Sequence, residues 1–143
     1  MIFSDTSTLA KFYIVEPESP SVRKAFEKSG GIMLSQLARA ELFGVFHRRM
    51  RERTWTKGEF QACVRQFQRD EADGLWNWVP VDTAILSAVC ETFLVLPDTL
   101  FLRTADCIHL TTAINQGFDA IHTHDRHQSA TAAHFGINPI TLS

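Results

Sequence analysis

Four acidic residues, far apart in the sequence, are the side chains whose types and settings point most clearly to chemistry. Asp5 directly follows an apolar N-terminal run, and Asp125 follows Ile121–His124. Glu41 and Asp106 lie within helical patterns of apolar residues. Each acid alone has an ordinary explanation, as a helix cap, an ion-paired helix-edge residue, a first-turn acid or a turn residue. Together they predict one shared acidic site.

A cluster of carboxylates suits the hydrolysis of a phosphodiester with Mg²⁺ or Mn²⁺. These hard cations prefer oxygen ligands, and Mg²⁺ usually takes one or two protein carboxylates and several waters. Neighbouring carboxylates repel one another, and a bound cation removes that repulsion. The cation also lowers the pKa of a bound water and neutralises charge that develops on the phosphate.

Short apolar strands that alternate with helices must position these acids. We expect strands at 1–5, 32–34, 76–81, 120–123 and 140–142, and helices at about 8–15, 20–29, 35–53, 57–73, 83–95, 103–116 and 126–134. Ser7 or Thr8 is the expected cap of the first helix, and Ser35 that of the third. This alternation predicts parallel strands with helices on both faces, in a single domain over residues 1–143. Ligands bind such sheets beyond the carboxyl ends of the strands. Asp5 and Asp125 would therefore meet at one edge.

Composition sets limits on the function. The chain has 143 residues, of which 45% are hydrophobic and 21% charged, a globular balance. The formal net charge of −2 excludes nucleic-acid binding by bulk positive charge, so any such contact needs a local patch or bound metal ions. Three scattered cysteines favour neither a disulfide framework nor a thiolate zinc site. With no signal sequence or membrane span recognisable, we expect a cytoplasmic protein.

The acidic stretches, taken with their neighbours, resemble a known family. The stretches Asp5-Thr6-Ser7, Glu41 in the third helix, Arg103-Thr104-Ala105-Asp106-Cys107-Ile108-His109-Leu110 and Thr123-His124-Asp125-Arg126 are similar to the four acidic motifs of PIN-domain nucleases. In length and motif order the whole chain resembles the VapC toxins of bacterial toxin–antitoxin pairs.

The resemblance implies a three-layer α/β/α fold around a short parallel sheet of four to five strands. It also implies Mg²⁺- or Mn²⁺-dependent cleavage of RNA and inhibition by a cognate antitoxin. Separately, we expect a homodimer, for which the aromatic residues of the long helices are a candidate face. By this resemblance, Asp5 and Asp106 would be metal ligands, and Glu41 and Asp125 would complete the acidic pocket. Thr123 would orient a metal-bound water, and Ser7 would support Asp5.

Arginines and aromatic residues near these motifs have further candidate roles. Arg103 and Arg126 flank the expected site and are candidates for RNA phosphate contacts. The basic run 47–53 is a solvated helix face or a surface that steers RNA. His109, three residues after Asp106, is expected to be a packed core residue, with contact to a phosphate as the alternative. The aromatic residues of the long helices form core or a partner groove; they are Phe43, Phe46, Trp55, Phe60 and Phe67.

Two alternative functions remain open at this stage. The histidine-rich segment that contains His122, His124 and His127 resembles the zinc signature of metallo-β-lactamase-fold hydrolases, with its acid displaced by one position. In a strand over 121–124, however, Thr123 would face away from His122 and His124. The second alternative is a PIN-like binding module that has lost catalysis and acts only through its partner.

Overall fold

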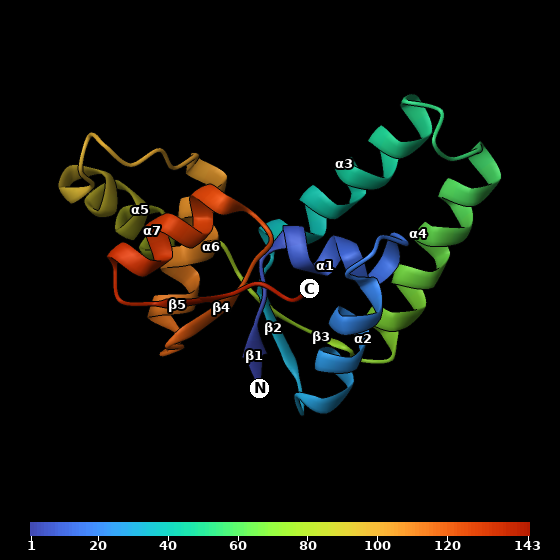
Figure 1. The fold of residues 1–143 in the computed structure, drawn as a ribbon, viewed down its shortest axis with the longest axis horizontal. Coiled ribbons are helices and arrows are strands. Elements are labelled where there is room, and N and C mark those ends of the chain that lie inside the picture. Colours follow the sequence, from blue (N-terminus) through green and yellow to red (C-terminus); the bar gives the residue numbers. More distant parts are fainter.

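The computed structural model describes residues 1–143 and contains five short strands and seven helices (Figure 1). The strands are β1 (Ile2–Phe3), β2 (Ile32–Ser35), β3 (Trp76–Val79), β4 (Ala120–His122) and β5 (Asn138–Ile140). The helices are α1 (Thr6–Tyr13), α2 (Ser19–Lys28), α3 (Leu37–Arg51), α4 (Lys57–Ala72), α5 (Thr83–Val95), α6 (Thr104–Asn115) and α7 (Arg126–His134).

All strand pairs are parallel. β2 pairs with both β1 and β3, and β4 pairs with β5. One parallel bridge between Ser4 and His122 connects the two groups, and the Asp5 amide donates to the His122 carbonyl at 3.0 Å. The strands therefore follow the order β3–β2–β1–β4–β5, with a narrow junction between β1 and β4.

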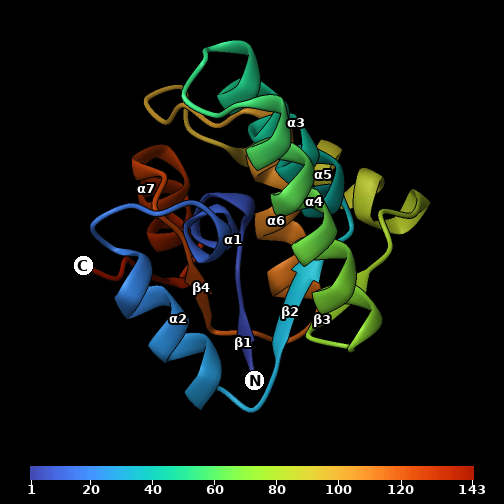
Figure 2. The same ribbon diagram turned by 90° about the vertical axis from the view of Figure 1, so that its right-hand side faces the viewer.

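Helices cover both faces of this sheet, as the alternation of side chains along its strands requires. Ile2 and Leu34 face the larger core beneath α1–α4, whereas Phe3 and Met33 face a second core formed with α6 and α7. Helix α5 packs on α6 through a third apolar cluster that includes Ile85 and Ile108. The predicted three-layer α/β/α arrangement is confirmed, and Figures 1 and 2 show the two helical groups on opposite sides of the sheet.

Three local predictions were wrong in detail. Asp5 itself caps α1, in place of Ser7 or Thr8, because its carboxylate accepts a hydrogen bond from the Thr8 amide. Gln36, and not the expected Ser35, occupies the residue before α3, although Ser35 Oγ still accepts a hydrogen bond from the Leu37 amide at 3.2 Å. The last strand is Asn138–Ile140 and not 140–142, because the chain turns at Gly136 (φ +75°) and joins β4 at once. Pro139 is tolerated there because β5 is an edge strand.

The aromatic residues of α3 and α4 mainly form core. Phe46 and Phe67 are fully buried, and Phe43 and Phe60 pack against the same cluster. Trp55 also packs there but lines a separate cavity of about 790 Å³ between α1 and α4. None of the helices has the length and apolarity needed to cross a membrane.

Candidate functional site

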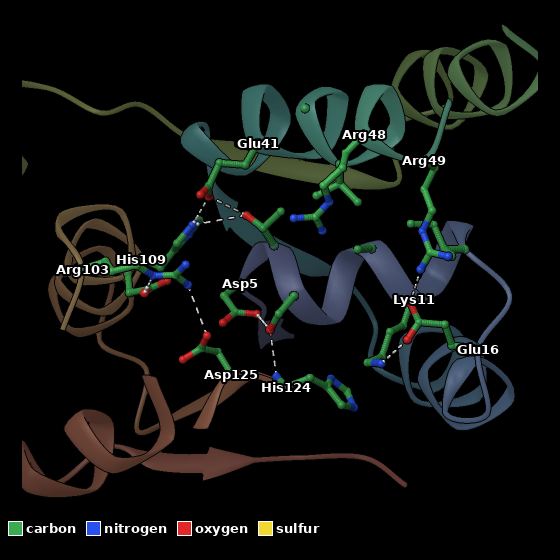
Figure 3. Close-up of a pocket in the computed structure, with 17 residues that line it drawn as sticks. Asp5, Lys11, Glu16, Glu41, Arg48, Arg49, Arg103, His109, His124 and Asp125 are labelled. Atoms are coloured by element: carbon green, nitrogen blue, oxygen red, sulfur yellow. Dashed lines mark hydrogen bonds and ion pairs between the residues drawn. The ribbon is translucent and has the colours of Figure 1, made fainter. Parts of the chain in front are cut away.

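All four predicted acids line one open pocket of about 540 Å³ at the carboxyl edge of the sheet (Figure 3). Asp5 follows β1, and Asp125 lies three residues beyond β4. Glu41 projects from α3, and Asp106 lies in the first turn of α6. The chain therefore brings together carboxylates that are up to 120 positions apart in sequence.

Asp5 is the most deeply buried of the four, with 2% of its surface exposed. Its Oδ1 accepts hydrogen bonds from Ser7 Oγ (2.6 Å) and the Thr8 amide (3.2 Å), and its Oδ2 accepts one from Thr123 Oγ1 (2.5 Å). Burial raises the pKa of Asp5, and this effect exceeds the lowering by the electrostatic interaction with His109 and by the three hydrogen-bond donors. An adjacent cation would offset the cost of ionising this carboxylate.

Arg103 joins the carboxylates of Asp106 and Asp125. Its Nε donates to Asp106 Oδ2 at 2.8 Å, and its Nη2 donates to Asp125 Oδ2 at 3.2 Å. The hydrogen bond and charge of Asp106 raise the pKa of Arg103. The Arg103 side chain is 60% exposed, so its guanidinium can exchange these partners for a ligand. Arg126, the other arginine predicted to contact phosphate, is exposed on α7 and does not line the pocket.

Glu41 contacts His109, a residue that was expected from the sequence to belong to the core. His109 Nε2 lies 2.5 Å from Glu41 Oε1, and Thr6 Oγ1 donates to the same oxygen at 2.7 Å. Burial alone would raise the pKa of Glu41, but the hydrogen bond and charge of His109 and the bond from Thr6 outweigh it, so the pKa is lowered. His109 is 1% exposed yet lines the pocket. Its position one helical turn after Asp106 is the sequence signal that points to this role.

Ser7 and Thr123 both orient Asp5. Ser7 Oγ accepts from the His124 amide at 2.8 Å while it donates to Asp5. Thr123 Oγ1 accepts from the Asp125 amide at 3.1 Å and gives its own proton to Asp5. Ser7 and Thr123 thus direct their hydroxyl protons to the two carboxylate oxygens of Asp5.

We expect Thr123→Val to weaken Mn²⁺ binding by about 10–100-fold, the usual effect of removing a hydrogen bond that orients a metal ligand. Donation from Thr123 stabilises ionised Asp5, so its loss raises the Asp5 pKa further and moves the onset of metal binding to higher pH. Calorimetric titration with Mn²⁺ at several pH values measures both effects.

Thr112→Val is the matched control for this variant. Thr112 is equally buried, but its hydroxyl donates to the Ile108 carbonyl within α6. Unchanged Mn²⁺ affinity and an unchanged pH dependence in Thr123→Val would show that this hydroxyl does not prepare Asp5 for a cation.

The three histidines of the zinc alternative have separate surroundings. Both ring nitrogens of His124 are engaged, Nδ1 with Thr8 Oγ1 and Nε2 with the Leu142 carbonyl. His127 packs edge-on against Phe101, and His122 is buried, with a pKa lowered mainly by burial. This arrangement does not support a zinc site built from His122, His124 and His127.

The acidic pocket fits a hard divalent cation of the Mg²⁺ or Mn²⁺ type. No three of its His, Cys, Asp or Glu side chains are grouped closely enough to hold an ion by themselves. Mg²⁺ commonly binds through one or two carboxylates and keeps several waters, and Asp5 and Asp106 offer such a donor set. Three helices, α1, α6 and α7, also begin at the pocket, and their N-terminal partial positive charges reduce the repulsion between its acids.

Comparisons with known proteins show similar folds and identify the family. VapC20 of Mycobacterium tuberculosis, a toxin that cleaves the sarcin–ricin loop, is similar with a TM-score of 0.71 and 16% identity, over 92% of this chain and 95% of that one. The VapBC2 structure from Rickettsia felis, bound to a promoter DNA fragment, gives a TM-score of 0.67 and 13% identity over the full length of both chains. No curated protein matches the sequence significantly. Residues 2–134 match the PIN domain pattern, and the chain therefore belongs to the PIN domain family.

Proposed function

We propose that this protein is a Mg²⁺- or Mn²⁺-dependent endoribonuclease and the toxin of a toxin–antitoxin pair. The observation that carries the proposal is the meeting of Asp5, Glu41, Asp106 and Asp125 in one pocket at the carboxyl edge of a PIN-family sheet. The structural likeness to a toxin that cleaves the sarcin–ricin loop supports RNA as the substrate class.

In this proposal, Asp5 and Asp106 hold the cation, which would supply an acidified water and neutralise charge on the phosphate. Hydrogen bonds from Ser7 and Thr123 favour the ionised form of Asp5 against the effect of burial and fix the orientation of its carboxylate. Glu41, whose pKa is lowered, is ionised at neutral pH and faces the pocket as an acceptor for a proton of the attacking water.

Arg103 connects the acids to the substrate. It is anchored by Asp106 and Asp125 and exposes most of its surface. An incoming phosphate can therefore take one of its donors while the other stays on a carboxylate. Asp125 fixes the position of this guanidinium and caps α7 by accepting from the Gln128 amide at 2.8 Å.

We also propose two protein partners, a cognate antitoxin and a second copy of this chain. The likeness to VapBC2 supports the antitoxin, and the separate cavity beside Trp55, with seven hydrophobic residues in its lining, offers an apolar surface for it. A homodimer is supported by the apolar side chains that α5 leaves exposed, including Leu86 (46%) and Leu94 (84%). Light scattering of the purified chain, alone and with the product of the adjacent reading frame, measures both assemblies.

The test of function is cleavage of total RNA by the purified chain. Discrete products that form with Mg²⁺ or Mn²⁺, and disappear with a chelator or the cognate antitoxin, are the expected result. The alternative of a PIN-like module without catalysis predicts no products and no heat of metal binding at millimolar Mg²⁺ or Mn²⁺, and that outcome would reject the nuclease assignment.

A further inference from the structure

The acidic pocket continues along α3 and α1, beyond the four carboxylates. Its far wall includes Gly44 and Arg48 on one side and Lys11 and Glu16 on the other. Figure 3 shows the Arg48 side chain directed into the space between Glu41 and Lys11. The pocket therefore has an acidic end, where a cation fits, and an end lined by basic side chains.

Most of the positive charge at that second end is already neutralised. Glu16 pairs with Lys11 Nζ at 2.6 Å and with Arg49 Nη2 at 3.0 Å, and Glu18 pairs with Lys11 at 3.1 Å. Arg48 makes no ion pair and no side-chain hydrogen bond within the chain. Arg48 is thus the pocket's unpaired cation, free to bind an anion from solution.

Gly44 is an unusual residue at this position. It lies in the interior of the 15-residue helix α3, where glycine is less favourable than every residue except proline. Packing does not explain it, because a Cβ at Gly44 would meet no atom within 4 Å. The missing side chain instead leaves open the part of the pocket wall between Glu41 and Arg48, which lie three residues before it and four after it on one helix face.

We propose that Gly44 and Arg48 form a subsite for the sugar–phosphate backbone of a single RNA strand. The strand crosses α3 over Gly44, and a phosphate beside the scissile one pairs with Arg48. Glu41 and Arg48 are seven residues apart, or about 10 Å along the helix axis, so the two ends of the pocket contact different nucleotides. This inference rests on RNA as the proposed substrate and adds to it the path of the strand.

Binding of a short fluorescein-labelled single-stranded RNA of mixed sequence, in the presence of a chelator, tests the subsite without requiring catalysis. For single strands, each phosphate that a protein neutralises contributes about 0.7 to the slope of log affinity against log salt. We therefore expect Arg48→Gln to reduce the magnitude of that slope by about 0.7. Arg51→Gln, which removes a charge from the same helix outside the pocket, should leave the slope unchanged.

Gly44 variants test the strand path by separating stability from binding. Gly44→Ala should raise the melting temperature by about 2–6 °C, because alanine favours the helix. Gly44→Leu should weaken RNA binding by about tenfold or more because its side chain fills the crossing point, with Gly44→Ala intermediate. Gly58→Ala, at a helical glycine outside the pocket, should leave RNA binding unchanged.

The outcomes separate this inference from the proposed function. Equal slopes for Arg48→Gln and Arg51→Gln, wild-type binding by Gly44→Leu, or no RNA binding by the wild-type chain would each overturn the subsite. RNA binding that depends on Gly44 and Arg48, in a chain that cleaves no RNA with Mg²⁺ or Mn²⁺, would support the subsite and reject the nuclease function.

Discussion

We expect Asp5→Asn to reduce metal-dependent RNA cleavage by about 10³-fold or more, because the removed ligand accounts for several kcal/mol of the charge stabilisation that a bound cation gives. The same variant should be more stable than the wild type when no metal is present. Burial raises the pKa of Asp5 in the folded protein, so ionised Asp5 makes a net unfavourable contribution to folding at neutral pH.

The sign of this stability effect can be followed with pH. The contribution of Asp5 to the free energy of unfolding is fully present below its unfolded-state pKa, near 3.8. This contribution is lost as the pH rises through the higher folded-state pKa of Asp5. Asparagine does not ionise, so the stability advantage of the variant should be absent at acidic pH and constant above the folded-state pKa. Melting curves with a chelator at several pH values measure it.

Asp82→Asn is a closely matched control. Asp82 caps α5 with the same extended backbone as Asp5 and accepts from the Ile85 amide, but it lies outside the pocket. Asparagine caps helices as well as aspartate does, so neither substitution should disturb the fold. Asp5→Asn with wild-type cleavage, or a loss of activity equal to that of Asp82→Asn, would rule out Asp5 as a metal ligand.

We expect Asp106→Asn to cause a comparable loss of cleavage without the gain in stability. Asp106 is the second proposed ligand, so its replacement should weaken Mn²⁺ binding and reduce the rate by about 10³-fold. The substitution removes a negative charge that interacts favourably with the N-terminus of α6, and it removes an ion pair with a mostly exposed arginine. The free energy of unfolding should therefore fall by about 1 kcal/mol or less.

Glu59→Gln controls for helix position in that experiment. Glu59 occupies the third position of α4, as Asp106 does in α6, and glutamine can replace it in the capping box with Thr56. Calorimetry, RNA cleavage and thermal melting of the two variants separate the loss of a ligand from the loss of a helix-end charge. Full metal affinity in Asp106→Asn would exclude this residue from the site.

Strand-end geometry made two of the acids predictable. Asp5 and Asp125 follow apolar strands, and parallel strands bring their carboxyl ends to one edge. The motif around Asp106 added the third. For Glu41, the only sequence signal was its position at the edge of the apolar stripe of a helix. Its contact with His109 joins residues 68 positions apart, which no local pattern reveals.

The finer arrangement of the site depends on tertiary contacts. His109 was predicted to be core because its helix is apolar, and it is indeed buried, yet its Nε2 reaches the pocket. Arg103 was expected to contact phosphate. Its position in the sequence does not reveal that its guanidinium pairs with the carboxylates of both Asp106 and Asp125. The direction of the Thr123 hydroxyl likewise follows from the single bridge that places β4 beside Asp5.

The two capping aspartates have a consequence for how this gene can change. Asp5 and Asp125 each hold the first turn of a helix, and asparagine, serine or threonine would do so too. The fold therefore places little constraint on the carboxylate itself, and under the proposed function a single mutation at either position would abolish activity while the protein stays folded. Under the proposed function, such an inactive but folded copy would compete with active copies for their antitoxin and so raise toxicity in a cell that carries both.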